Sequence, residues 1–340
     1  MKKPRIGKPV KIVIEIVLLG LLALLFIRIM DAEQFQNIFT QITFRVFLAV
    51  LGFQLLLQLL GTFQWSLILR EAGISRGPWR AFWSKMSGYS VTYLTPSMYF
   101  GGEPVRAVLY KDDGMSYQRV YATIALDKYI ELFGKLPCIL IGFSLLLLRV
   151  HTGWPVIALA SLLIFSSVVL FLFLTVKLFN SRTFIVTFAK KLIRPFTRIN
   201  RRAAVKVLRA MREFARDVAE VIRKKKVFYL AMILSVLVAV VEVLQTYYLL
   251  TVLGTPDIYD SFIIFASVVV QGLIGFLPGN LGGMEGTHLF VFSILWLGST
   301  QSLIYSIVLR MGQMSMVLLG LMNLLLSRIL KARRIGADRN

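Results

Sequence analysis

The chain has few residues of the types that soluble enzymes use for catalysis and metal binding. Its 340 residues include one cysteine, Cys138, and two histidines, which excludes an intramolecular disulfide and a cysteine-built metal site. Charged residues make up only 16% of the chain, well below the share of roughly a quarter found in soluble domains. A P-loop, an H-E-x-x-H motif and a dinucleotide fingerprint are all missing. We therefore predict no catalytic residue, no metal, no cofactor and no enzymatic activity.

Apolar residues, in contrast, are abundant. They form 57% of the chain, and the mean hydropathy is +0.74. Several apolar runs reach the roughly 20 residues that a helix needs to cross about 30 Å of hydrocarbon. The sequence predicts an all-α integral membrane protein with about six full transmembrane helices, over residues 11–30, 44–70, 119–149, 154–178, 227–253 and 301–328.

Two further apolar stretches, 82–110 and 261–297, are interrupted by proline and glycine. A helix that faces lipid tolerates such interruptions poorly, because they free backbone groups that water cannot reach. We interpret both stretches as re-entrant or broken helical hairpins.

Acidic residues are scarce beside basic ones, 17 against 39, and the net charge is +22. The basic residues cluster between the apolar runs, where orientation in the membrane explains them better than binding to nucleic acid. Basic loops stay in the cytoplasm, which predicts a multi-pass protein of the cell membrane with both termini cytoplasmic. The first interrupted stretch is then entered from the cytoplasm and the second from the opposite face.

These patterns divide the chain into an N-terminal membrane repeat (1–179), a basic connection (180–226) and a C-terminal membrane repeat (227–340). Within the connection, Met211, Phe214 and Val218 recur at helical spacing and arginines fill the other positions. We expect either a cytoplasmic basic amphipathic helix on the membrane surface or a linker helix packed on its own protein. The two interpretations are compatible.

The interrupted stretches share a motif. The first reads YLTPSMYFGGEPVRAVLY and the second GFLPGNLGGMEGTHLFVF. Glu103 follows Pro96 by the same interval at which Glu285 follows Pro278, and each motif has a glycine pair. A duplicated motif with opposite entry predicts an inverted repeat, in which two broken helices build one binding site.

Helix N-termini that follow the glycines would present unpaired N–H groups to an anion. The alternative is that the glycines only permit tight packing, while Glu103 and Arg106 neutralise each other. We favour substrate binding, and the candidate residues in the motifs are Gly101, Gly102, Glu103, Arg106, Pro278, Gly282, Gly283, Glu285 and His288.

Other ionisable residues fall inside predicted spans. Asp127, Lys128 and Glu131 lie in the third span and Glu242 in the fifth, and we add all four to the candidate binding site. They either line a hydrophilic cavity or form internal ion pairs that lower the cost of insertion, and we favour the cavity. Arg310 in the last span is the expected partner of Glu242.

At the two glycine motifs the sequence resembles the lysylphosphatidylglycerol synthase transmembrane-region family. The resemblance extends from about the second predicted span to the last. It implies a membrane module that moves lipids between leaflets. The aminoacyl-transferase domain of the bifunctional synthases is not in the sequence, so we do not expect synthase activity.

The leading hypothesis is a lipid translocase for a phospholipid or polyprenyl-linked lipid with an anionic or aminoacylated headgroup. The alternatives are an accessory subunit that presents lipid to a separately encoded transferase, or a membrane-embedded transferase. The expected partners are membrane lipids, namely anionic or aminoacylated phospholipids or polyprenyl phosphates, and not nucleic acid. A homo-oligomer is compatible with the sequence.

Overall fold

The computed structural model describes residues 43–95, 101–149, 201–274 and 278–337, with three isolated positions between 149 and 201. Within these ranges the chain forms helices and loops and no strand. Four helices are long and apolar enough to cross a membrane: α3 (Phe44–Glu71), α6 (Tyr117–Arg149), α10 (Lys225–Val252) and α14 (Ser299–Ala337). They confirm an α-helical membrane protein and match four predicted spans. The predicted spans 11–30 and 154–178 lie outside the described residues.

Both proline- and glycine-containing stretches are interrupted helices, as predicted. The first consists of α4 (Pro78–Leu94) and α5 (Glu103–Tyr110). The second consists of α11 (Ile258–Ala266), α12 (Val268–Ile274), the 3₁₀ turn η1 (Pro278–Asn280) and α13 (Gly283–Ile294). Gly279 and Gly282 adopt φ angles of 62° and 77°, in the region that glycine enters most readily, and this backbone conformation breaks the second stretch.

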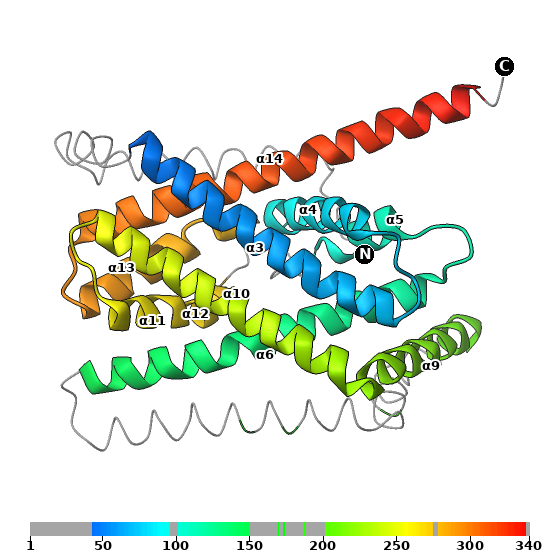
Figure 1. The fold of residues 1–340 in the computed structure, drawn as a ribbon, viewed down its shortest axis with the longest axis horizontal. Helices are drawn as coiled ribbons and strands as arrows, with labels where there is room; N and C mark the ends of the chain where they lie inside the picture. The colour runs from blue at the N-terminus through cyan, green and yellow to red at the C-terminus, as the bar shows by residue number, and fades with distance from the viewer. Residues whose placement is uncertain are drawn as a thin grey trace, which may run out of the picture.

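Figure 1 shows α3 and α14 running in one direction and α6 and α10 in the other. The helices α3 and α10 cross side by side, α4 packs on α14, and α11 packs on α6. The pair α4–α5 lies toward the end of the molecule where α6 begins, whereas α11 and α13 lie toward the end where α14 begins. The two interrupted segments therefore occupy opposite ends of the long helices.

Small residues make the closest helix crossings. A Cβ atom on Gly134 of α6 would lie 2.1 Å from the Ser235 Oγ of α10. A Cβ atom on Gly320 of α14 would lie 2.1 Å from the Ser90 Oγ of α4. Such close approach of backbones is the main means by which helices associate in lipid, where the hydrophobic effect contributes little.

The helix α9 (Arg201–Arg223) lies within the basic connection and contacts α6. Its Ala215 and Val218 are buried, whereas three arginines at helical spacing are exposed, namely Arg209, Arg212 and Arg216. The described part of the connection thus packs on the protein through its apolar face. Contact of the exposed arginines with lipid stays a prediction.

Candidate functional site

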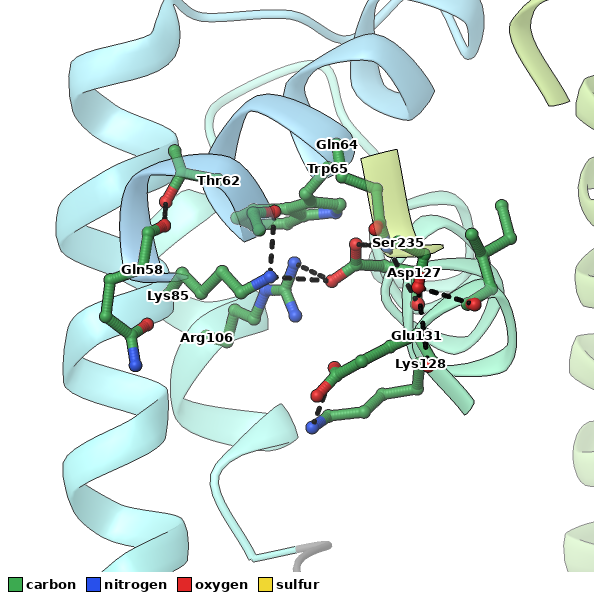
Figure 2. A network of polar contacts seen from close by, with 12 residues as sticks. Gln58, Thr62, Gln64, Trp65, Lys85, Arg106, Asp127, Lys128, Glu131 and Ser235 are labelled. Atoms are coloured by element: carbon green, nitrogen blue, oxygen red, sulfur yellow. Dashed lines mark hydrogen bonds and ion pairs between the residues drawn. The ribbon is translucent and has the colours of Figure 1, made fainter. Parts of the chain in front are cut away.

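Asp127 of α6 is the centre of a buried charge cluster to which four helices contribute (Figure 2). Its side chain is fully buried. Arg106 of α5 donates from Nη2 to Oδ2 at 2.7 Å, and the Lys85 Nζ of α4 lies 3.4 Å from the same oxygen. Gln64 of α3 donates from Nε2 to Oδ1 at 2.9 Å. Two cations therefore share one carboxylate inside the helix bundle.

Trp65 of α3 supports the Arg106 side chain. The Arg106 guanidinium carbon lies 3.6 Å from the centroid of the Trp65 ring, which is close enough for a cation–π interaction. The indole Nε1 donates to the Thr123 Oγ1 at 3.3 Å, which fixes the ring. The Arg106 Nε is buried and finds no hydrogen-bond partner among the described residues, so the guanidinium has donor capacity left.

The first glycine pair lets α5 approach α4 closely. The Gly102 N–H donates to the Thr92 Oγ1 at 2.9 Å, and a Cβ atom on Gly102 would lie 1.8 Å from the carbonyl oxygen of Gly88. Gly101 precedes it and is half-buried. Tight packing is therefore one real role of Gly102. Neutralisation of Glu103 by Arg106 is not observed, because Arg106 pairs with Asp127.

Glu103 is the first residue of α5. One of its carboxylate oxygens, Oε2, is buried and accepts no hydrogen bond from any described residue. The positive end of the helix dipole favours a carboxylate at this position. An acceptor left unpaired in a buried position nevertheless costs free energy, so Glu103 retains capacity to bind a donor.

The remaining ionisable candidates, on α6 and α10, form ion pairs at partly exposed positions. Lys128 pairs with Glu131 at 3.3 Å, and Lys135 donates from Nζ to the Glu242 Oε1 at 2.8 Å. The expected pairing of Glu242 with Arg310 was wrong. The reason is that α10 packs beside α6, so the nearest cation to Glu242 is Lys135.

Arg310 of α14 instead forms contacts with the turn that interrupts the second helical stretch and with α4. It forms an ion pair with Glu285 of α13, and its Nη1 donates to the Tyr93 hydroxyl of α4 and to the Gly279 carbonyl oxygen, both at 2.8 Å. The Glu285 Oε2 also accepts the N–H of Gly282 at 2.9 Å, which caps α13. Pro278 begins η1 and Gly283 begins α13, so both belong to this turn.

His288 has different surroundings from Arg106, its predicted counterpart. Its ring is buried, with Nδ1 2.7 Å from the Ser306 Oγ and Nε2 3.0 Å from the Gln271 Nε2. Both ring nitrogens are thus engaged by neutral groups. The two motifs build two polar clusters, and α4 contacts one through Lys85 and the other through Tyr93.

Sequence reasoning missed three members of these clusters: Gln64, Lys85 and Tyr93. Lys85 offered a signal, since it is an ionisable residue inside an apolar stretch, a position that is usually functional. Gln64 and Tyr93 offered none, because single polar or aromatic residues in a span commonly serve helix packing.

The fold and the clusters define a multi-pass α-helical membrane protein with buried charges beside two interrupted helices. The sequence model of the lysylphosphatidylglycerol synthase TM region matches residues 12–320, and the chain belongs to this family. The chain is also similar to a UPF0104 membrane protein of Methanothermobacter thermautotrophicus (strain Delta H), with 28% identity over 258 residues, 74% of this chain and 75% of the relative. No solved structure matches the chain.

Proposed function

We propose that the chain is a lipid translocase that moves a phospholipid or polyprenyl-linked lipid with an anionic or aminoacylated headgroup between leaflets. The observation that carries this proposal is the Asp127 carboxylate, which is fully buried in a helix apolar enough to span and is shared by Arg106 and Lys85. Ionisable groups at membrane depth are costly and are usually retained for function. Membership in a family defined by the membrane region of a lipid-modifying protein supports the same reading.

The chemistry of this cluster suits a phosphate group. Two cations face one carboxylate, and the Arg106 Nε has no hydrogen-bond partner among the described residues. Guanidinium groups bind phosphate oxygens through several N–H donors held in a fixed plane. In the proposed mechanism the headgroup enters the polar cluster while its acyl or prenyl chains remain in the bilayer.

We further propose that the membrane part is an inverted repeat with re-entrant hairpins, of which α3–α6 is one half and α10–α14 the other. Helix packing supports this assignment. The helix α4 contacts α14, and its counterpart α11 contacts α6. Likewise, α3 contacts α14, and its counterpart α10 contacts α6. Rocking of one half against the other would then alternate access to the site.

Chemical labelling tests this topology. Ser116 and Ser299 are exposed and stand at the beginning of α6 and α14, the corresponding helices of the two halves. Cysteines at these positions, in a Cys138→Ser background, should react with an impermeant thiol reagent from opposite sides of the membrane. Ser116→Cys should react from the cytoplasmic side. Reaction of both cysteines from one side would refute the inverted repeat.

A leaflet-exchange assay in liposomes tests translocation. Wild-type protein should accelerate the exchange of one class among anionic, aminoacylated and polyprenyl-phosphate lipids. Glu103→Gln should slow this exchange at least about tenfold, the factor that corresponds to about 1.4 kcal/mol, because in the proposed mechanism the unpaired Oε2 of Glu103 accepts a donor from the headgroup. The variant should still fold, since the Glu103 Oε2 accepts no hydrogen bond from any described residue that the substitution would break.

Glu213→Gln on α9 is the matched control, because it makes the same chemical change outside the proposed site. It should exchange lipid at the wild-type rate. Absence of exchange for every lipid class with folded wild-type protein would contradict the proposal. It would favour an accessory subunit that presents lipid to a separate transferase.

A further inference from the structure

One face of α10 is exposed along most of the helix. After the lysines at its start, the exposed side chains begin with Tyr229 and continue to Tyr247 and Thr251, and every exposed side chain between the two tyrosines is aliphatic. They recur every three or four residues, which places them on one stripe along the helix. The aliphatic members of this stripe are Leu230, Ile233, Leu237, Val240 and Leu244.

The buried face of α10 has a different composition. Its small residues Ala231, Ser235 and Ala239 all face the protein. Helices in membranes associate mainly through small residues, because these let the backbones approach closely. The stripe between Tyr229 and Tyr247 contains no glycine, alanine or serine. It therefore lacks the residues that favour packing against a further helix.

The stripe has the length of a bilayer crossing. Tyr229 and Tyr247 are 18 residues apart, which is about 27 Å along a helix and close to the roughly 30 Å thickness of the hydrocarbon core. Tyrosine is enriched at both membrane–water interfaces, because its ring is apolar and its hydroxyl is polar. Lys225 and Lys226 precede Tyr229 and are exposed, at a position from which ammonium groups reach the headgroups. An aliphatic stripe of this length between two tyrosines is the pattern expected for contact with lipid.

Exposed tryptophans lie at the same two ends of the molecule. Trp79, the second residue of α4, is 69% exposed at the end where α10 begins. Trp296, between α13 and α14, is 95% exposed at the end where α10 ends. Its φ angle is 58°, a conformation that glycine would adopt at lower cost. A tryptophan at such a position indicates a contact of its side chain outside the protein, and tryptophan prefers the membrane–water interface.

The stripe also indicates the depth of the buried charge cluster. Ser235 of α10 donates from Oγ to the Ile130 carbonyl oxygen of α6 at 2.9 Å, so these two residues lie at one level. Ser235 is six residues after Tyr229, about 9 Å, and twelve residues before Tyr247, about 18 Å. The helices α6 and α10 run in the same direction (Figure 1), and Asp127 precedes Ile130 by about one turn. Asp127 is therefore nearer to the level of Tyr229 than to that of Tyr247.

We propose that the stripe on α10 contacts the acyl chains of both leaflets, with Tyr229 and Tyr247 at opposite membrane–water interfaces. Trp79 and Trp296 lie at the same two interfaces, and the Asp127 carboxylate lies in the half of the bilayer next to Tyr229. Lipid is the partner that fits, rather than a second copy of this chain, because the stripe is aliphatic and without small residues. This proposal requires only that α10 spans the membrane, and does not depend on lipid translocation.

Spin labelling of α10 tests the proposal on the full chain in lipid nanodiscs. Ile233→Cys, Leu237→Cys and Leu244→Cys are each made in a Cys138→Ser background, and a nitroxide is attached to the new cysteine. Electron paramagnetic resonance then measures how often the label collides with oxygen, which concentrates at the bilayer centre, and with a nickel chelate, which stays in water.

The ratio of oxygen to nickel collisions should be several times higher at Leu237 than at the other two positions. Leu237 is about 12 Å from the level of Tyr229 and about 15 Å from that of Tyr247, whereas Ile233 and Leu244 are only about 6 Å and 4.5 Å from the nearer tyrosine. The control is Arg212→Cys on the exposed face of α9, which should give a ratio below all three.

Three results would overturn the proposal. Few collisions of the Leu237 label with either reagent would show that another helix or a second copy of the chain covers the stripe. Frequent collisions of this label with nickel would show that the stripe faces water. A highest ratio at Ile233 or Leu244 would move the tyrosines away from the interfaces, and with them the inferred depth of Asp127. The measurement involves no leaflet exchange, so its failure would leave the proposed translocation untouched.

Discussion

Asp127→Ala is expected to lower the free energy of unfolding by about 3–5 kcal/mol, the cost of removing one partner from a buried ion pair. The reason is that Arg106 and Lys85 both direct their charges at this carboxylate. Without it, two cations remain in the interior and repel each other. Gln64 also loses its acceptor at Oδ1. The effect should appear as a large fall in the yield of monodisperse protein and in the thermal unfolding midpoint, followed by tryptophan fluorescence.

Glu131→Gln provides the comparison on the same helix, four residues away. Its ion pair with Lys128 is one-third exposed, so the loss should be at most about 1 kcal/mol. Equal stability of the two variants would mean that burial does not set the cost, and would remove the physical basis for a charge cluster centred on Asp127.

Gly102→Val should be the most damaging single change in the first glycine motif. Already a Cβ atom on this residue would lie 1.8 Å from the Gly88 carbonyl oxygen and 2.4 Å from the Thr92 Oγ1, both on α4. The backbone of α4 cannot yield without moving Lys85 and Tyr93. We expect α5 to separate from α4, with a loss of stability above about 3 kcal/mol and loss of lipid exchange, since overpacking of this severity exceeds the usual range of roughly 1–3 kcal/mol.

Gly286→Ala is the matched control in the second motif. Nothing lies within 4 Å of a Cβ atom at this position, which is inside α13. Alanine should therefore be tolerated, with a gain of about 0.5–1 kcal/mol from the lower conformational freedom of the unfolded chain. Thermal unfolding of the two variants in the same detergent checks both expectations. Wild-type behaviour of Gly102→Val would show that α4 and α5 do not pack as described.

The long spans could be predicted because hydrophobicity and length alone determine them. The run 227–253 became α10, Lys225–Val252, within two residues at each end. The interruptions were equally predictable, since proline and paired glycines end helices for local reasons. Sequence does not specify which face of one helix meets which face of another. For this reason the sequence predicted an ion pair of Glu242 with Arg310. In the structure α10 packs on α6, and Glu242 pairs with Lys135 instead.

The same holds for the buried charge cluster: its residues could be predicted from the sequence, but their pairing could not. Arg106 and Asp127 were both candidates, because each is an ionisable residue at membrane depth. Their pairing, and the presence of Lys85 on the same carboxylate, depends on how α5 and α4 fold back against α6. Spacing along the chain instead suggested Glu103 as the neighbour of Arg106 on one helix face. Tertiary packing overrode that local expectation.

The helix α4 is bonded to one charge cluster near its middle and to the other near its end. Lys85 and Tyr93 are eight residues apart, which is about 12 Å along the helix axis, and the helix between them is stiff. A slide of α4 along its axis by a single residue, about 1.5 Å, would displace both Lys85 relative to Asp127 and Tyr93 relative to Arg310. Because one stiff helix contacts both clusters, a displacement of α4 at one cluster would be transmitted to the other.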